Sequence, residues 1–266
     1  MATQIIPIVI GYNVEPETLA IYTRIQGASG GFTMTPDQVL YLNNKVVAIK
    51  TANSNVLPAF WYDAAVSVDY GNILATKVFN LGTAGASGDG TMTNGQVSSM
   101  TAGSDLNKYF SFTSASSQSI QTTYPTQKTG TWFSVLRPSA AAAERVVFGT
   151  SGNAATVLQV TNLQRLQLER AFQAAIATST ASFSTSTWNT FGFSFNSGTD
   201  YALNLNLNAD ATGTTTDSYV ARNLRIGEKI GTSFYDGSIQ SLAIFDTVMN
   251  NTLQNTIQDI LKGSLT

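Results

Sequence analysis

The sequence predicts a mainly β protein, an antiparallel β-sandwich preceded by a short helical segment. From about residue 57 onward, short segments rich in aromatic and β-branched residues alternate with turn clusters, a pattern typical of sandwiches. The first fifty-odd residues instead place apolar side chains three and four positions apart, as amphipathic helices do. We therefore divide the chain into a helical docking segment, residues 1–56, and a sandwich, residues 57–266.

The first helix is expected to begin near Pro16, because proline is favoured in the first turn of a helix. Leu19, Tyr22 and Ile25 follow three residues apart, which predicts that they share one face of the helix. Gly27 and the glycines after it are expected to end the helix.

A second helix start is marked by Thr35 and Gln38, which have the spacing of a capping box. The apolar stripe that follows predicts one buried face, formed by Val39, Leu42, Val46 and Ile49. Two short helices bury little surface by themselves. We expect them to pack on the sandwich or on a partner chain.

Alternating apolar residues and turn clusters indicate the strands of the sandwich. The clearest are residues 110–113, 132–136, 145–148, 191–195 and 201–207. Residues 163–177 suit either a helix or a strand, and the β surroundings favour a strand. A last helix is predicted near the C-terminus, with Asn250 or Asn251 as its cap, Gly263 beyond its end, and one apolar face formed by Leu253, Ile257 and Ile260.

The composition excludes several kinds of chemistry. The chain has neither histidine nor cysteine, which excludes Ser-His-Asp and Cys-His catalysis, Cys/His zinc sites and disulfides. Charged residues make up 11% of the chain, against about 25% in typical globular proteins. Serine and threonine account for 61 of the 266 residues. The surface is therefore expected to be polar through hydroxyls and amides.

The charge and hydropathy patterns indicate neither a nucleic-acid partner nor membrane insertion. A net charge of −2 supplies no positive field for a phosphate backbone. No apolar run reaches the roughly 18–20 residues that span a bilayer. The apolar stretch 5–10 lacks the basic residues and the cleavage pattern of a signal peptide, so we expect synthesis in the cytoplasm.

Residues 57–266 resemble the concanavalin A-like lectin/glucanase superfamily in its laminin-G-like jelly-roll form. The matching segments, in order, are LPAFWYDA at 57–64, GTMTNG at 90–95, FSF at 110–112, TWNTFGF at 187–193, LNLNLN at 203–208, LRIG at 224–227, FYDGSI at 234–239 and LAIF at 242–245. The resemblance implies a jelly-roll fold. This superfamily includes lectins, hydrolases and virion adhesins, so the resemblance leaves the function open.

Hydrolases of this superfamily carry catalytic carboxylates in an E-x-D-x-x-E strand, and two carboxylates are needed to cleave a glycosidic bond. This chain has five glutamates, none with an acidic partner at strand spacing in the β region: Glu15, Glu17, Glu144, Glu169 and Glu228. We therefore expect no enzyme activity. The glycine-rich run 82–90 lacks the lysine and the helix that follow a phosphate-binding loop, and a flexible surface loop is expected there.

Ligand sites are only sparsely indicated. No cofactor is expected, and calcium stays open as a metal, with Asp63, Asp69, Asp89 and Asp105 as scattered candidates that lack the spacing of a ligand loop. Trp61, Trp132 and Trp188 are expected to be core residues. The candidate carbohydrate contacts are three tyrosines near predicted loops, Tyr201, Tyr219 and Tyr235.

The hypothesis we favour from sequence is a virion structural protein of a tailed bacteriophage: a fibre, spike or capsid decoration. Residues 30–50 are similar in style to helical stretches that precede jelly rolls in phage structural proteins. Its expected partners are other virion proteins, further copies of itself (a homo-oligomer such as a trimer) and host surface glycans. The alternatives are a non-viral carbohydrate-binding module or adhesin, and a glycoside hydrolase.

Overall fold

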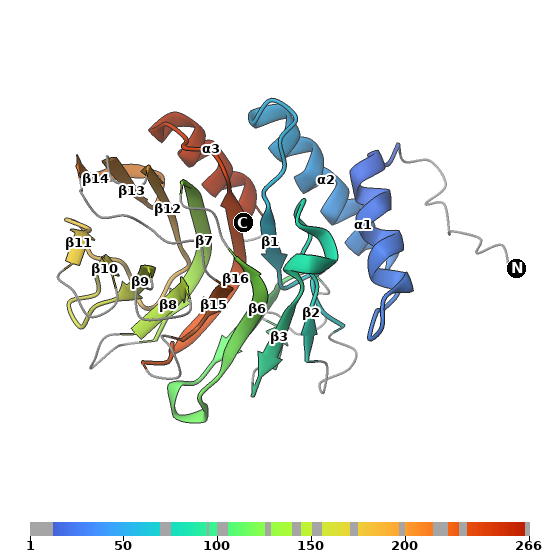
Figure 1. Ribbon diagram of the computed structural model, residues 1–266, viewed down its shortest axis with the longest axis horizontal. Coiled ribbons are helices and arrows are strands. Elements are labelled where there is room, and N and C mark those ends of the chain that lie inside the picture. The colour runs from blue at the N-terminus through green and yellow to red at the C-terminus, as the bar shows by residue number, and fades with distance from the viewer. Residues whose placement is uncertain are drawn as a thin grey trace, which may run out of the picture.

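The computed structural model shows two antiparallel sheets packed face to face, with helices on the outer side of one of them (Figure 1). It describes residues 13–69, 76–94, 96–99, 106–125, 129–139, 145–150, 156–170, 175–196, 200–214, 223–228 and 233–263. The predicted fold class, a mainly β sandwich with a short helical segment in front, is confirmed.

The first sheet, called sheet A here, has eight strands in the described part of the chain, in the order β14-β13-β12-β7-β16-β5-β4, with β1 also paired to β16. Two strands share one edge of β16: its residues 237–239 pair with β5, and its residues 241–244 pair with β1. The strands of sheet A are β1 (Phe60–Asp63), β4 (Gln96–Ser99), β5 (Lys108–Phe112), β7 (Gly130–Pro138), β12 (Asn189–Asn196), β13 (Asp200–Leu205), β14 (Asn208–Thr214) and β16 (Gly237–Phe245).

The second sheet, sheet B, follows the order β11-β10-β9-β8-β15-β6-β3-β2. Its strands are β2 (Lys77–Val78), β3 (Gly90–Thr93), β6 (Ser119–Pro125), β8 (Arg145–Thr150), β9 (Thr156–Val160), β10 (Leu166–Arg170), β11 (Ala175–Thr178) and β15 (Asn223–Ile226). Two short 3₁₀ turns, η1 (Gly85–Gly88) and η2 (Ser114–Ser116), lie between strands. The ambiguous stretch 163–177 therefore contributes two strands, β10 and most of β11.

Aromatic side chains from both sheets fill the space between them. Trp132 of sheet A lies 4.9 Å from Phe148 of sheet B, measured between ring centroids, and 5.5 Å from Phe195. Phe148 also stacks on Phe191 at 5.5 Å. The strict alternation of β12 produces this arrangement, because Phe191, Phe193 and Phe195 all point to the same buried face.

The predicted strand 201–207 ends earlier than its alternation indicates. Asn206 and Leu207 both have positive φ, +50° and +65°, and form the two-residue turn between β13 and β14. Leu203 and Leu205 face the core, whereas Leu207 lies in the turn.

The first two helices are α1 (Pro16–Gly27) and α2 (Pro36–Ala52). The capping box of α2 is confirmed: Gln38 N donates to Thr35 Oγ1 at 3.3 Å, and Thr35 N donates to Gln38 Oε1 at 2.8 Å. The predicted buried face of α1 is confirmed at Tyr22 and Ile25, but Leu19 is 40% exposed. Ile21 is buried on this face instead of Leu19.

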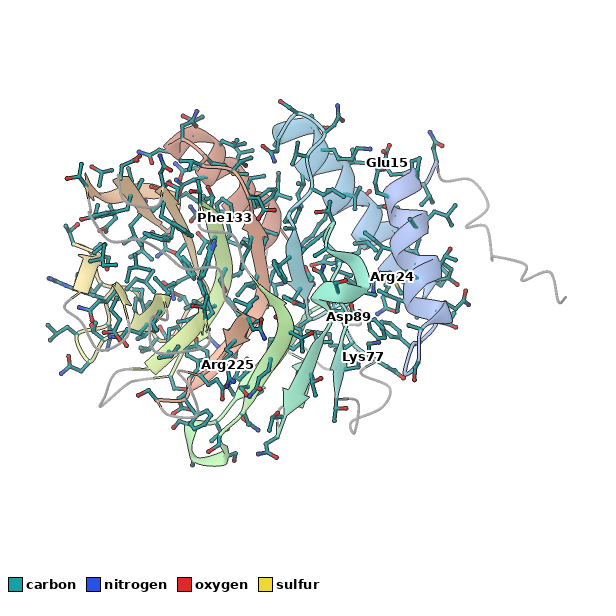
Figure 2. The ribbon with its side chains drawn as sticks, in the orientation of Figure 1. Glu15, Arg24, Lys77, Asp89, Phe133 and Arg225 are labelled. Carbon is teal, nitrogen blue, oxygen red and sulfur yellow. The ribbon has the colours of Figure 1, made fainter. Side chains whose placement is uncertain are left out.

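The helices pack on the outer face of sheet A and share a core with it. Trp61 of β1, Phe133 of β7 and Phe245 of β16 point away from the sandwich interior into this layer, and Figure 2 marks Phe133. The helical residues that meet them include Ile21, Tyr22, Ile25, Leu42, Val46, Ile49, Ile257 and Leu261. The apolar faces of α1 and α2 are thus covered within the chain itself.

The C-terminal helix, α3 (Asn251–Lys262), crosses the same face of sheet A. Asn250 caps it, its side chain accepting a hydrogen bond from Leu253 N at 2.9 Å. Gly192 of β12 lets α3 approach closely, because a Cβ atom there would lie 2.8 Å from Gln254 Oε1 and 2.9 Å from the Phe133 ring.

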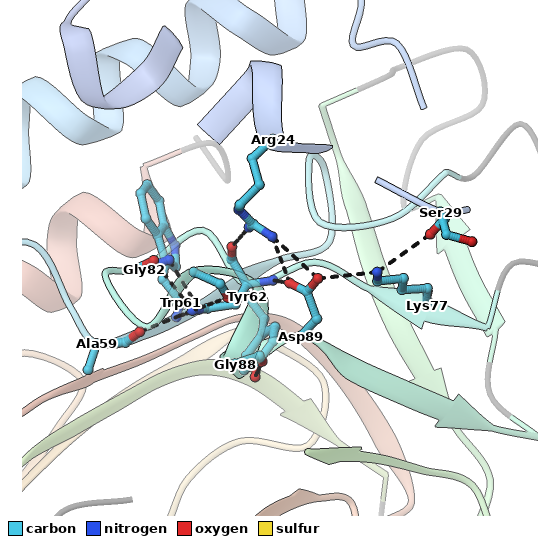
Figure 3. A network of polar contacts seen from close by, with 11 residues as sticks. Arg24, Ser29, Ala59, Trp61, Tyr62, Lys77, Gly82, Gly88 and Asp89 are labelled. Carbon is cyan, nitrogen blue, oxygen red and sulfur yellow. Dashed lines mark hydrogen bonds and ion pairs between the residues drawn. The ribbon is translucent and has the colours of Figure 1, made fainter. Parts of the chain in front are cut away.

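A polar network attaches α1 to the sandwich (Figure 3). Arg24 Nη1 lies 3.0 Å from Asp89 Oδ1, and Lys77 Nζ lies 3.4 Å from Asp89 Oδ2. Asn80 N donates to the same carboxylate at 2.9 Å. These bonds hold the glycine-rich run 82–90 in place, so it is a tethered turn and not the free surface loop that its composition indicates.

Candidate functional site

Three side chains on the outer face of sheet A form a partly exposed cluster of two aromatic rings and one cation: Tyr109, Arg137 and Trp188. The ring centroids of Tyr109 and Trp188 lie 5.9 Å apart, with 57° between the ring planes. The guanidinium carbon of Arg137 lies 5.2 Å from the Trp188 centroid and 5.8 Å from the Tyr109 centroid. These distances are within the range of cation–π attraction to both rings.

The strand pattern explains why these residues face outward. On β5, Phe110 and Phe112 point into the sandwich. Side chains alternate along a strand, so Tyr109 points to the outer face of sheet A. On β7, Leu136 points inward and Arg137 outward. Trp188 immediately precedes β12, whose first residue pairs with Leu136, and this register brings Trp188 beside Arg137.

Small side chains separate the two edges of the cluster. Ser238 of β16 pairs with Arg137 on one side and with Ser111 on the other. Paired residues in an antiparallel ladder share a face, so Ser238 of β16 and Ser111 of β5 lie on the same face of sheet A as Arg137. Their small size leaves room for the long Arg137 side chain to extend across β16 toward Tyr109.

Within the described ranges, no carboxylate neutralises the charge of Arg137. Among the described residues, no carboxylate lies within ion-pair distance of its guanidinium, and none accepts a hydrogen bond from it. Arg24 and Arg225, by contrast, ion-pair with Asp89 and Glu228. Arg137 therefore keeps its N–H donors available at a surface lined by two aromatic rings.

Of the three tyrosines expected to contact carbohydrate, the two that the structure describes, Tyr201 and Tyr235, are not brought together. Tyr201 is partly buried against the sandwich core and covers Gly213, where a Cβ atom would lie 2.8 Å from its hydroxyl. Tyr235 is fully buried and meets Phe112 edge-on, with ring centroids 5.9 Å apart. Burial raises the pKa of the Tyr235 hydroxyl well above its usual value, and no surface is left for a sugar. Tyr219 lies outside the described residues.

The tryptophans divide into two kinds. Trp61 and Trp132 are core residues, 0% and 2% exposed, as expected. Trp188 lies at the rim of the helix-covered core and is partly exposed, which differs from the expected buried packing. The signal in the sequence is the polar run Ser184–Thr187 before it, which indicates a surface turn leading into the strand.

The glutamates in the described ranges are held by the chain's own side chains. Glu15 and Glu17 both pair with Lys50, at 2.6 and 2.9 Å. Glu228 pairs with Arg225 and accepts a hydrogen bond from Gln121 at 2.9 Å. A further pair, Glu169 and Gln159, is joined across neighbouring strands at 3.1 Å. Glu144 lies outside the described residues, and the expectation of no enzyme activity remains a prediction.

Two of the candidate calcium ligands are already paired with cations of the chain. Asp63 accepts from Lys45 Nζ at 2.9 Å, and Asp89 pairs with Arg24. Asp105 lies outside the described residues. Within the described ranges no group of three or more Asp, Glu, His or Cys side chains is placed to hold a metal ion. A search of the same ranges finds no helix long and apolar enough to cross a membrane.

Comparison with solved structures assigns the chain to a class of fold. No protein-family model and no curated protein sequence matches it. Domain 4 of AbnA, a GH43 extracellular arabinanase from Geobacillus stearothermophilus solved in complex with arabinotriose, aligns at a TM-score of 0.56 and 11% identity, covering 76% of this chain and 98% of that chain.

Two sialidase structures are also similar. Trypanosoma rangeli sialidase in complex with the inhibitor DANA aligns at a TM-score of 0.56 and 8% identity over 86% of this chain, which spans only 38% of the sialidase. The CBM40 of Ruminococcus gnavus IT-sialidase, bound to α2,3 sialyllactose, aligns at 0.42 and 18% identity over 49% of this chain and 82% of that chain. The arabinanase domain and the Trypanosoma rangeli sialidase, both aligned at 0.56, show the fold, a jelly-roll sandwich like the one that the sequence resemblance implied.

Proposed function

We propose that the chain is a carbohydrate-binding module whose ligand rests on the Tyr109–Arg137–Trp188 cluster. The observation that carries the proposal is the unpaired Arg137 guanidinium lying against two partly exposed aromatic rings. A carbohydrate-binding module is the alternative that the sequence offered beside the favoured virion role, and the arabinanase domain of the same fold, solved in complex with arabinotriose, supports it.

The chemistry of the cluster suits a sugar. One face of a pyranose or furanose ring exposes C–H groups, which pack against the negative face of an aromatic ring. Arg137 adds N–H donors for ring hydroxyls, and Ser111 supplies a further hydroxyl on the same face. A shallow surface of this kind gives modest affinity, and we expect a dissociation constant of about 0.1–1 mM, or roughly −4 to −5.5 kcal/mol.

Isothermal titration calorimetry of the full chain against a panel of neutral and acidic oligosaccharides tests the proposal. Trp188→Ala is expected to weaken the binding of any responding sugar at least tenfold. Leu163→Ala is the matched control, because Leu163 is 68% exposed in the turn between β9 and β10 of sheet B, away from the cluster. Equal binding by the wild type and Trp188→Ala, with both proteins folded by circular dichroism, would place the site elsewhere.

The virion structural role remains a prediction, since neither the cluster nor the comparisons bear on a virus particle. The same holds for other virion proteins and further copies of the chain as partners, and for location in a virion. Contact with glycans is the element that this role shares with the proposal made here. Mass spectrometry of purified particles tests the virion role independently.

A further inference from the structure

Arg137 differs from Arg24 and Arg225, because the groups found against its guanidinium in the described part of the chain are aromatic rings and not carboxylates. Arg24 and Arg225 each reach a buried carboxylate, Asp89 or Glu228, whose side chains are 8% and 3% exposed. Asp236, one residue before β16, makes no ion pair with Arg137. Arg137 is partly exposed, so a ligand at this surface can reach its guanidinium.

The aromatic neighbours of Arg137 leave its hydrogen-bond donors available. Trp188 and Tyr109, whose planes are inclined by 57°, both lie within cation–π distance of the guanidinium. Its N–H bonds lie in its own plane, and a planar fork of donors matches the two oxygens of a carboxylate. Neither ring competes for these donors, because aromatic faces accept only weakly.

The serines beside Arg137 extend the polar surface in one direction. Ser238 is the cross-strand partner of Arg137, and Ser111 is the next residue along the same row. Ser111 is partly exposed. A ligand whose ring packs on Trp188 and whose charged group binds Arg137 therefore has the Ser111 hydroxyl as a further donor in the same row of the sheet.

We propose that the ligand is an acidic saccharide, a uronic acid-containing glycan whose carboxylate binds Arg137 while its ring packs against Trp188 or Tyr109. This inference rests on the proposed function and adds the class of ligand. A neutral sugar covering the cluster removes water from the guanidinium without supplying a counter-charge, so it binds more weakly.

Two ligand pairs test the inference, each differing only in the carboxylate. The first pair is tetragalacturonate and its full methyl ester, and the second is an unsulfated chondroitin tetrasaccharide and its carboxyl-reduced form. In calorimetric titrations of the full chain, at least one acid is expected to bind at least tenfold tighter than its neutral counterpart. Raising the salt concentration is expected to narrow that ratio, because exposed ion pairs are screened.

Substitution of Arg137 locates the effect. Arg137→Met keeps most of the stem and removes the charge, and we expect it to bring the acid-to-neutral ratio close to one. Arg137→Lys restores charge without the planar fork, and partial recovery of the ratio is expected. The Leu163→Ala control should leave the ratio as in the wild type, and circular dichroism verifies folding of each variant.

The remaining outcomes separate this inference from the proposed function. Equal binding of acid and neutral forms, or a preference that survives in Arg137→Met, overturns the acidic-ligand inference alone. If neutral sugars of the wider panel bind but neither acid does, the acidic-ligand inference alone is likewise overturned. No binding to any saccharide overturns both.

Discussion

The ammonium of Lys45, on α2, lies 2.9 Å from Oδ2 of Asp63, at the end of β1, and both side chains are almost fully buried. The same Nζ donates to the carbonyl oxygen of Leu261 at 2.8 Å, in the last turn of α3. Asp63 also accepts from the Tyr41 hydroxyl at 3.0 Å and from Ala65 N at 3.0 Å. The buried ammonium of Lys45 thus connects α2 and α3 to β1 of sheet A.

Replacing Lys45 with methionine is expected to destabilise the protein strongly. The Asp63 carboxylate would stay buried without its counter-ion, and breaking such a pair from one side costs about 3–5 kcal/mol. Urea unfolding followed by tryptophan fluorescence measures the loss. Lys50→Met on the same helix is the control, since its partners Glu15 and Glu17 are partly exposed, and a much smaller loss is expected. Comparable losses in the two variants would contradict the role given to Lys45.

The stabilisation from Lys45 is expected to depend on pH only under alkaline conditions. Burial by itself lowers the pKa of Lys45, but Asp63 and Tyr41 outweigh it and the net pKa is raised. A lysine whose pKa is higher in the folded state stabilises fully below its unfolded pKa of about 10.4, and less as pH rises further. The difference in unfolding free energy between wild type and Lys45→Met should be constant from pH 7 to pH 9 and shrink near pH 11. A difference in unfolding free energy that grows as the pH rises would contradict a raised pKa of Lys45 in the folded state.

Arg24→Met is expected to loosen α1 from the sandwich. The substitution removes the ion pair with Asp89 and the hydrogen bond from Arg24 to the carbonyl of Asn80. Hydrogen bonds to charged groups contribute about 1.5–3 kcal/mol, and the partial exposure of Arg24 places the loss at the lower end. The backbone amides of residues 16–27 should exchange their hydrogens faster in Arg24→Met than in the wild type, whereas exchange in β7 should stay the same. Arg165→Met, at an exposed turn, is the control and should leave both segments unchanged.

Gly192→Val is expected to displace α3. A Cβ atom at this position would lie 2.8 Å from Gln254 Oε1, 2.9 Å from the Phe133 ring and 3.0 Å from Gln258 Nε2. Such overpacking costs about 1–3 kcal/mol. A thermal melt measures it, with Gly27→Ala as the control because a Cβ there meets nothing within 4 Å. An unchanged melting temperature in Gly192→Val would mean that α3 does not lie as close as described.

Two buried glutamines of α3 are expected to respond differently to the same substitution. Gln254 Nε2 donates to Ser194 Oγ at 3.0 Å and to the Met249 carbonyl at 2.9 Å. Gln258 has no hydrogen-bond partner for either amide atom among the described residues. Replacing Gln254 with leucine should therefore cost about 1–2 kcal/mol, whereas Gln258→Leu should be neutral or stabilising. Denaturant midpoints compare the two, and a larger loss for Gln258→Leu would reveal a partner for that amide.

Local signals in the sequence predicted most of the secondary structure, because their causes lie within a few residues. The capping box at Thr35 and Gln38 satisfies backbone groups of its own first turn. The alternation in β12 depends only on the pleat of an extended strand. Where a local signal was misread, the cause was also local, as in the turn at Asn206 and Leu207.

The apolar run 132–136 of β7, interrupted only by Ser134, shows where local information ends. Trp132 and Phe133 are both buried, and a run of this kind indicates a strand covered on both faces. Trp132 meets the second sheet, whereas Phe133 meets α3, an element more than a hundred residues further along the chain. The sequence pattern indicates that other elements pack on both faces of β7, but it does not identify those elements.

The sequence by itself determined the fold class, the capping box of α2 and the exclusion of histidine and cysteine chemistry. The tertiary structure decided the position of the candidate site. Tyr109, Arg137 and Trp188 come from three separate segments, and each side chain faces outward because of its own strand's alternation. They meet only because β5, β16, β7 and β12 are neighbours in that order, and strand order is set by how the whole core packs.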